Sequence, residues 1–168
     1  MKRAPLSLLV VIGVVGFFYL QNRPRPANDA SAYVGKPGPE LQVQQWISEA
    51  PDPTGKHLLV DFWATWCGPC IGAIPHMNEL HAQFQDRLTI VGLSRESRQK
   101  VESMRSPQMD YYSAVDTQAR MASFFNIRSI PQVVLMDPQG IVLYKGHPAY
   151  LDEETLQTLL SAPDANES

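Results

Sequence analysis

The chain has 168 residues, and its 14 Lys and Arg residues are outnumbered by 17 Asp and Glu residues, which gives a formal net charge of −3. Because this balance is slightly acidic and no long basic run occurs, nucleic acid is not an expected partner. Only two cysteines are present. This excludes a small scaffold held by several disulfides, and no glycine-rich loop of phosphate-binding form appears.

Residues 4–22 form an uncharged, mostly apolar run directly after Lys2 and Arg3. As a helix this run would be roughly 28 Å long at about 1.5 Å per residue, close to the about 30 Å of a bilayer's hydrocarbon core. A cleaved signal peptide is the alternative, but its apolar region usually has about 7–15 residues. The nearest small-x-small site, at residues 30–32, also lies well past the run. The pattern favours an uncleaved transmembrane signal anchor at 4–22.

The anchor predicts where the rest of the chain lies. A first transmembrane helix of this type usually leaves its N-terminus in the cytoplasm, although Arg23 and Arg25 after the run weaken the positive-inside bias. We therefore expect a single-pass protein of the cell inner membrane whose main domain faces the periplasm or another extracytoplasmic space. Residues 23–33 would be a flexible, proline-containing linker.

The segment around the two cysteines has the pattern of a strand followed by a helix. Residues 57–64, HLLVDFWA, are a short apolar run rich in residues that favour strands. Residues at the spacing of one helix face then follow: Cys70, Ile74, Met77 and Leu80. Cys67 is thus expected at the helix N-terminus, where free N–H groups and the helix dipole favour a thiolate. Cys70 is expected one turn further in and shielded from solvent.

Three interpretations of the Cys67–Cys70 pair are open. A structural disulfide across so short a loop would stabilise the fold by only roughly 2 kcal/mol, against about 4.7 kcal/mol for a 100-residue loop. A zinc site commonly needs four ligands, and the histidines of the chain do not repeat a finger-like spacing. The third interpretation is redox chemistry, in which the two sulfurs alternate between dithiol and disulfide. The strand-to-helix context favours the third.

The rest of the chain alternates strands and helices. The expected elements in order are a strand at 88–94, a polar helix within 95–107, an extended segment at 110–116, a helix at 117–126, a hairpin at 132–146 and a last helix from Asp152, followed by a polar tail at 163–168. Asp116 is placed to cap the 117–126 helix, and Asn126 to end it in the left-handed conformation. Residues 137–140, Asp-Pro-Gln-Gly, are typical of a tight hairpin turn.

Two motifs carry a resemblance to a known family. Residues 61–70, DFWATWCGPC, resemble the active-site stretch of thioredoxins, and residues 129–140, SIPQVVLMDPQG, match a second element of that family. The opening VGKPGPEL at 34–41 is similar to the start of membrane-anchored TlpA/ResA-type thiol-disulfide oxidoreductases. The resemblance covers residues 34–162. It implies an α/β thioredoxin fold, with a central mixed sheet flanked by helices and a central insertion, in which the Ile130–Pro131 bond is cis and faces the disulfide.

The resemblance also implies a function, the reduction of disulfides in extracytoplasmic client proteins. Cys67 would attack as a thiolate and Cys70 would resolve the mixed disulfide. The expected client-binding residues are Trp66, Gly68, Pro69, Ile130 and Pro131. Neither a cofactor nor a metal is expected, because the dithiol carries the electrons. The implied partners are a membrane thiol electron donor and a secreted client, for which apocytochrome c is one candidate.

Two alternative functions remain open at this point. A disulfide-forming oxidase suits an extracytoplasmic space, but the Gly-Pro between the cysteines resembles reducing thioredoxins, at about −270 mV, rather than the oxidant DsbA, at about −120 mV. A copper-binding assembly chaperone of the same fold would need a wider cysteine spacing and a nearby histidine, for which His147 is the candidate. Ile71 departs from the basic residue more common in the family, which concerns client choice rather than chemistry.

The resolving thiol must lose a proton, and two acidic residues are candidates to accept it. Asp61 lies in the 57–64 strand, where alternation places it on the face opposite Val60 and Phe62, and a buried carboxylate with a raised pKa can serve as a general base. Glu96 resembles a glutamate beside the cysteines of ResA-like proteins. A solvated position in the first turn of the following helix is the alternative for Glu96. We expect Asp61 to be the acceptor, with Glu96 second.

Overall fold

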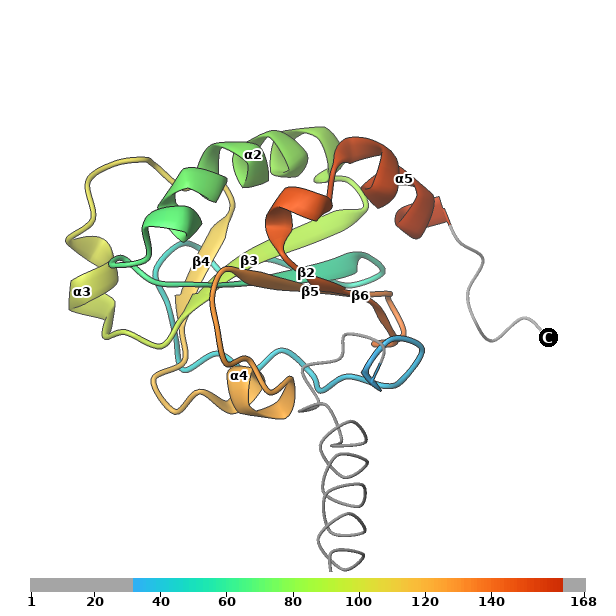
Figure 1. Ribbon diagram of the computed structural model, residues 1–168, viewed down its shortest axis with the longest axis horizontal. Coiled ribbons are helices and arrows are strands. Elements are labelled where there is room, and N and C mark those ends of the chain that lie inside the picture. Colours follow the sequence, from blue (N-terminus) through green and yellow to red (C-terminus); the bar gives the residue numbers. More distant parts are fainter. Residues whose placement is uncertain (1–31, 162–168) are drawn as a thin grey trace, which may run out of the picture.

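The computed structural model describes residues 32–161, which form a six-stranded mixed sheet with helices on both faces (Figure 1). The sheet order is β1-β4-β3-β2-β5-β6, from strands β1 (Gln45–Trp46), β2 (His57–Trp63), β3 (Leu88–Ser94), β4 (Tyr112–Val115), β5 (Gln132–Met136) and β6 (Val142–Gly146). The helices are α2 (Gly68–Phe84), α3 (Arg98–Glu102), α4 (Arg120–Phe124), the 3-10 turn η2 (Pro148–Tyr150) and α5 (Glu153–Ser161).

Strands β2, β3 and β4 are parallel to one another, whereas β1, β5 and β6 each run antiparallel to their neighbour. The predicted α/β architecture with a central mixed sheet is therefore confirmed. The elements α3 and β4 lie between the β2-α2-β3 unit and the β5-β6 hairpin, where the central insertion is expected.

The core has two layers, one on each face of the sheet. Helices α2 and α5 cover one face and α4 lies on the other (Figure 1). Because successive strand residues point to opposite faces, Leu59 packs in the layer of α2, while Val60 and Phe62 pack in the layer of α4. Burial of each such side chain contributes about 1.5–3 kcal/mol. The two layers thereby hold β2 in the one register that directs Asp61 toward α2.

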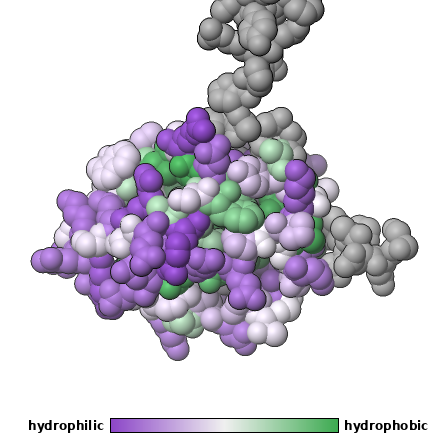
Figure 2. All heavy atoms as spheres, turned by 90° about the horizontal axis from the view of Figure 1, so that it is seen from below, coloured by the Kyte–Doolittle hydropathy of each residue, from purple (hydrophilic) through white to green (hydrophobic). Residues whose placement is uncertain are grey.

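The side of the molecule that carries α4 is mostly hydrophilic. Seen from below the orientation of Figure 1, apolar side chains lie in separate patches among polar ones (Figure 2). Among the described residues, Phe124 of α4 is one of four large apolar side chains that remain exposed.

The segment that precedes β1 runs along the end of the β5-β6 hairpin. Gly38 donates a backbone hydrogen bond to the carbonyl of Gly140 at 2.8 Å, and Pro37 forms an isolated bridge with Ile141. A Cβ at position 38 would lie 2.5 Å from the sulfur of Met136. Only glycine permits this close approach, so Gly38 ties the N-terminal segment to the hairpin.

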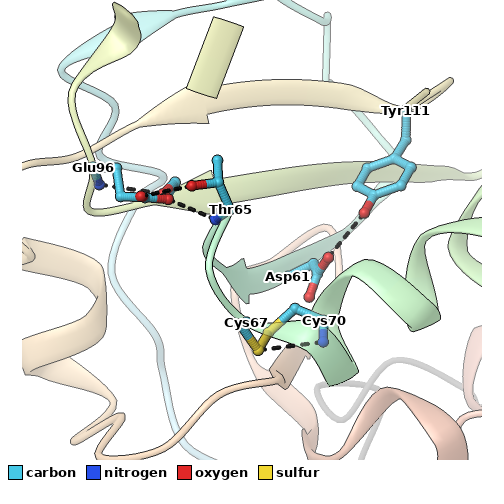
Figure 3. Close-up of a disulfide and its surroundings, with 7 residues drawn as sticks. Asp61, Thr65, Cys67, Cys70, Glu96 and Tyr111 are labelled. Carbon is cyan, nitrogen blue, oxygen red and sulfur yellow. Dashed lines mark hydrogen bonds between the residues drawn. A yellow bond between two sulfur atoms is a disulfide. The ribbon is translucent and has the colours of Figure 1, made fainter. Parts of the chain in front are cut away.

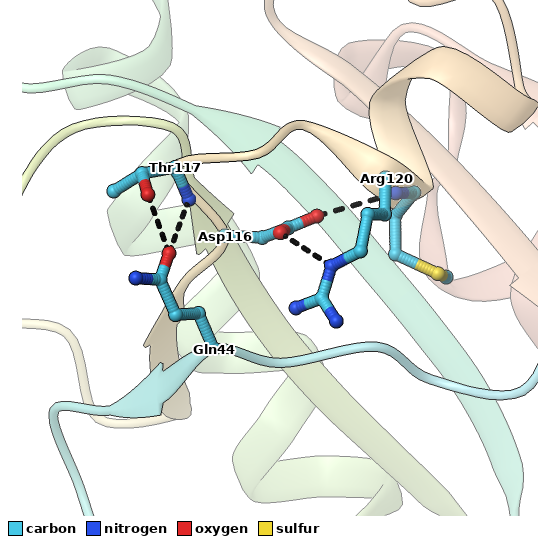
Figure 4. A network of polar contacts seen from close by, with 5 residues as sticks. Gln44, Asp116, Thr117 and Arg120 are labelled. Carbon is cyan, nitrogen blue, oxygen red and sulfur yellow. Dashed lines mark hydrogen bonds and ion pairs between the residues drawn. The ribbon is translucent and has the colours of Figure 1, made fainter.

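The helix predicted at 117–126 is shorter in the structure, because α4 begins at Arg120 and ends at Phe124. Its N-cap is Ala119, in the left-handed conformation at φ 55°, and Asp116 is therefore not the N-cap. Asp116 still bonds to the first turn of α4, although it precedes the N-cap. Its carboxylate accepts hydrogen bonds from the backbone N of Met121 at 3.3 Å and from Nε of Arg120 at 3.0 Å (Figure 4). The left-handed Asn126, at φ 50°, is confirmed.

Two predicted segments lie outside the described residues. These are the anchor at 4–22, with nearly all of the linker at 23–33, and the polar tail at 163–168. Within residues 32–161, no helix combines the length and the apolar character that a membrane span requires.

Candidate active site

Cys67 and Cys70 are joined by a disulfide, with an S–S length of 2.03 Å and Cα atoms 5.2 Å apart. Cys67 is the N-cap of α2, as predicted, and its Sγ accepts a hydrogen bond from the backbone N of Cys70 at 3.2 Å (Figure 3). Unpaired N–H groups and the helix dipole at this end favour negative charge on that sulfur. Both residues are buried, at 4% and 3% exposed. The predicted shielding of Cys70 is confirmed, and in this oxidised form it extends to Cys67.

Two exposed residues, Gly68 and Pro69, separate the cysteines and start the helix. Pro69 fits in the first turn because the N–H that it lacks would have no partner there. The position of the two residues beside the disulfide is consistent with the predicted client contact, which remains a proposal.

Asp61 lies on β2 and is 4% exposed, and Figure 3 shows its carboxylate between Tyr111 and the disulfide. Burial raises the pKa of Asp61 from its ordinary value of 3.8 to about 7, although a hydrogen bond from Tyr111 acts in the opposite direction. The raised pKa follows from the cost of placing a carboxylate charge away from water. A carboxyl group with this pKa can accept and release a proton near neutral pH.

The partner of Asp61 is Tyr111, whose hydroxyl donates a hydrogen bond to Oδ2 of Asp61 at 3.0 Å (Figure 3). Burial, and then the charge of Asp61, raise the pKa of Tyr111 well above 10, so its hydroxyl stays protonated. Tyr111 was not among the predicted site residues. The signal for it in the sequence is Gly92, in the middle of the apolar run at 88–94, because a glycine inside a strand often marks a close approach by another group.

Gly92 is the residue that makes room for Tyr111. It is the register partner of Asp61 on β3. A Cβ at position 92 would lie 2.5 Å from Cε of Met109, 3.0 Å from the ring of Tyr111 and 3.2 Å from Nε1 of Trp63. A larger residue would have to move the end of Met109 and would press on the Tyr111 ring that reaches Asp61.

Glu96 follows β3 and is bound to the loop that carries the disulfide. Its carboxylate accepts hydrogen bonds from the backbone N of Thr65 at 2.6 Å and from the Thr65 hydroxyl at 2.8 Å, with a longer one from Ser94 at 3.3 Å (Figure 3). Glu96 is therefore not merely a solvated residue of a first helical turn. It holds the backbone two residues before Cys67, whereas Asp61 lies beside the two sulfurs.

The predicted cis bond between Ile130 and Pro131 is present. Ile130 and Trp66 line a hollow of about 320 Å³, which we call the front groove and whose other walls include Arg95, Glu96, Thr117 and Ile127. Trp66 is 68% exposed, so its indole is open to solvent at this groove. The structure thus brings together Trp66 and Ile130 of the predicted client-binding set, while Gly68, Pro69 and Pro131 do not line this groove.

The described residues contain no group of three or more Cys, His, Asp or Glu side chains that could hold a metal ion. His147, the candidate ligand for copper, is engaged in local structure, because its Nδ1 accepts a hydrogen bond from the backbone N of Ala149 and caps η2.

The fold and the dithiol can be compared with known proteins. The model of the AhpC/TSA family matches residues 34–145, more than half of the chain. The chain belongs to this family. It is similar to the thioredoxin-like protein YneN of Bacillus subtilis (strain 168), at 26% identity over 147 residues that cover 83% of this chain and 85% of the relative. It is also similar to the thiol-disulfide oxidoreductase ResA of a Bacillus cereus strain, at 28% identity over 146 residues that cover 83% of each chain.

The fold of the chain is also similar to that of a solved structure. The thioredoxin domain of a thiol-disulfide oxidoreductase from Bacteroides vulgatus superimposes with a TM-score of 0.62 at 22% identity, covering 76% of this chain and 97% of that domain. The predicted thioredoxin-like fold and the resemblance to thiol-disulfide oxidoreductases are confirmed.

Proposed function

We propose that the protein is a thiol-disulfide oxidoreductase that reduces disulfides of client proteins through Cys67 and Cys70. The observation that carries this proposal is the disulfide at the N-terminus of α2, with a buried carboxyl group of raised pKa beside it. The family and the named relatives support the same chemistry.

The reaction would transfer two electrons in two exchanges of sulfur bonds. In the first, the Cys67 thiolate attacks a client disulfide, so that a Cys67–client bond forms, the client S–S bond breaks and one client thiolate leaves and takes up a proton. In the second, the Cys70 thiolate attacks Cys67, the enzyme disulfide closes and the second client thiolate leaves. A dithiol donor must then reduce the enzyme disulfide to restore the starting state.

Asp61 would accept the proton of the Cys70 thiol in the second exchange. Its position beside the disulfide and its pKa of about 7 allow it to take this proton at neutral pH. Glu96 would act earlier, because its bonds to Thr65 fix the loop from which Cys67 attacks.

The client would occupy the front groove. Trp66 and Ile130 offer apolar contact beside the sulfurs, and the backbone next to Pro131 could pair with an extended client segment. Gly68 and Pro69, which are exposed between the two cysteines, would contact the client beside this groove.

We further propose that residues 4–22 anchor the protein in the cell inner membrane with the described domain on the periplasmic side. The length and apolar character of that run support this, as does the opening of the domain at 34–41. The donor would then be a membrane thiol protein and the client a secreted protein, with apocytochrome c as one candidate. A mature chain that begins near residues 31–33 and washes off membranes would contradict the anchor.

Equilibration of the purified full chain with glutathione buffers tests the direction of electron flow. A potential near the about −270 mV of thioredoxin is expected, and a value above about −150 mV would favour a disulfide-forming oxidase instead. Competition of the reduced protein with a high-affinity Cu(I) chelator separates the copper chaperone, because two thiolates without a further ligand should lose the metal to the chelator and a dedicated copper site should keep it.

A Cys70→Ser variant identifies the client. It should retain the client as a mixed disulfide on Cys67, which mass spectrometry of the trapped species would show.

A further inference from the structure

A second hollow shares Trp63 with the front groove but is otherwise lined by different residues. This back cavity has a volume of about 260 Å³ and lies between β4, α3 and the segment before β4. Its inner walls are the buried residues Trp63, Tyr111 and Ser113, and exposed residues such as Glu102 and Arg105 form its rim. The cavity therefore leads from the partner of Asp61 to the surface.

Two polar atoms on the inner walls point to water as the content of this cavity. Nε1 of Trp63 and Oγ of Ser113 are both buried, and neither has a hydrogen-bond partner among residues 32–161. Buried donors without partners are rare because they lose their hydration without compensation. The lining also includes apolar side chains such as Val101 and Met109. These two polar atoms nevertheless give the hollow hydrogen-bonding sites, and its volume is large enough for several water molecules.

The sheet register places the proton acceptor and the cavity in one row. Asp61 of β2 is paired with Gly92 of β3, and Gly92 with Ser113 of β4. Register partners on adjacent strands point to the same face. The missing side chain of Gly92 leaves space for the Tyr111 ring, whose hydroxyl is bonded to Asp61 and which also lines the back cavity.

We propose, given the reductase function above, that Tyr111 is a positioning residue that connects Asp61 to water in the back cavity and so lets Asp61 return its proton to solvent while the client covers the front groove. The transfer is balanced: Asp61 passes the proton received from Cys70 to the oxygen of Tyr111, and Tyr111 gives its own hydroxyl proton to a cavity water. Tyr111 is neutral before and after, and its hydroxyl needs only to rotate about one bond.

The surroundings of Asp61 leave Tyr111 as the connection. Its register partners Gly92 on β3 and Val133 on β5 carry no titratable group. From α2 the two cysteines face it, and from the segment before β4 Tyr111 does. The charged residues Glu102 and Arg105 lie at the rim of the cavity, on the far side of Tyr111.

The decisive variant is Tyr111→Phe, which keeps the ring and removes the hydroxyl. In a stopped-flow measurement on the full chain with a fluorescent disulfide peptide, we expect the second exchange to slow about 5- to 20-fold at pH 7. Its pH profile should move to higher pH, because the carboxylate of Asp61 loses a hydrogen bond that stabilises it. The first exchange, measured with Cys70→Ser in the same background, should stay within about twofold.

Tyr112→Phe is the matched control, since Tyr112 is the next residue and packs against His81 instead. A second pair of variants tests the cavity itself: Ser113→Val fills it and should slow the second exchange about 2- to 5-fold, while Ser113→Ala leaves the space and should not. Equal rates and pH profiles for Tyr111→Phe and Tyr112→Phe would overturn the proposal, as would a slower rate with an unmoved profile.

A measurement that does not depend on enzyme activity distinguishes this inference from the proposed function. The ¹³C resonance of the Asp61 carboxyl in the oxidised protein should titrate at higher pH in Tyr111→Phe than in the wild type. If the wild type fails to reduce any disulfide but this shift is seen, the reductase function is wrong and the bond of Tyr111 to Asp61 stands. If the wild type reduces its peptide and the shift is absent, the connection is wrong.

Discussion

The front groove and the back cavity share one lining residue, Trp63, yet they differ in chemistry. The front groove combines the exposed Trp66 with Ile130 and two charged residues, Arg95 and Glu96. The back cavity has buried inner walls with polar atoms that lack partners among the described residues. This difference supports the two proposals above, in which the client would exchange sulfur bonds at the front groove and Asp61 would exchange protons with solvent through the back cavity.

Cys67→Ser should have the largest effect on activity, because it removes the sulfur that takes part in both exchanges. Reduction of a disulfide peptide should fall to the uncatalysed rate, while the circular dichroism spectrum stays that of the wild type. In the wild type, Cys67 should react with iodoacetamide as a thiol whose pKa lies below the about 8.5 of a free cysteine. Faster alkylation of Cys70 than of Cys67 would reverse the two roles.

Asp61→Asn should have the next largest effect on activity. It should act only on the second exchange, in which Asp61 accepts the proton of Cys70. Removal of a general base typically costs on the order of 10²- to 10⁴-fold in the step that it assists, and we expect the lower part of that range for the second exchange at pH 7. The first exchange should change far less. Stopped-flow measurement of the two steps checks this, and an equal loss in both would show that Asp61 is not specific to the second exchange.

The same substitution should change how stability depends on pH. The pKa of Asp61 is about 7 in the fold against an ordinary 3.8, so the native state holds this proton more tightly than the unfolded chain. The stabilisation that the protonated Asp61 gives the fold is fully present below pH 3.8 and is lost as the pH rises to about 7. At 1.36 kcal/mol for each pKa unit, the ionised group costs about 4 kcal/mol at pH 8. Urea unfolding of oxidised Asp61→Asn should show a gain of this order at pH 8 and little gain at pH 4. Asp86→Asn, at an exposed site, is the control for loss of charge.

Glu96→Gln should have a smaller effect on activity, and this effect should be confined to the first exchange. The amide can keep one bond to Thr65 but loses the charge-assisted pair, which is roughly twice as strong as neutral bonds. We expect the first exchange to slow about 2- to 10-fold, with the pH profile of the second unmoved. If Glu96→Gln slows the second exchange and Asp61→Asn does not, Glu96 is the proton acceptor.

Arg95→Gln should be the mildest change. Arg95 is exposed on the wall of the front groove and has no ion pair within 4 Å among the described residues. We expect kcat/KM for a peptide with an acidic residue beside its disulfide to fall about 2- to 5-fold, and the effect to shrink at high salt because exposed charges are screened. Arg105→Gln, at the rim of the back cavity, is the matched control and should leave kcat/KM unchanged. Equal losses for the two variants would contradict the assignment of the client to the front.

The sequence predicted the parts of this site that depend on local pattern. Cys67 at the start of α2 followed from helical spacing, and the orientation of Asp61 followed from alternation along β2. The cis bond at Pro131 and the thioredoxin fold came from the family resemblance. These features depend on nearby residues or on motifs that the family shares.

The contacts that escaped prediction join segments far apart in the chain. Tyr111 reaches Asp61 from fifty residues away, and Glu96 bonds to Thr65 from thirty-one residues away. Neither pairing can be seen in the periodicity of the sequence, because each depends on the register between neighbouring parallel strands. The helix predicted at 117–126 failed for a related reason: the bonds of Asp116 to Arg120 and Met121 hold the residues between them in a turn, and a left-handed Ala119 delays the helix.

The attachment of the N-terminal segment gives the domain a polarity. Residues 35–38 pair with the turn of the hairpin, near Met136, and Met136 aligns with Leu58 at the beginning of β2, whereas Phe62, near the cysteines, aligns with Gln132 at the other end of β5. The described chain thus enters the fold at one end of the sheet, whereas the start of α2, where Cys67 is the N-cap, lies at the opposite end (Figure 1). A partner can therefore approach the sulfurs without meeting residues 35–38, where the described chain enters the fold.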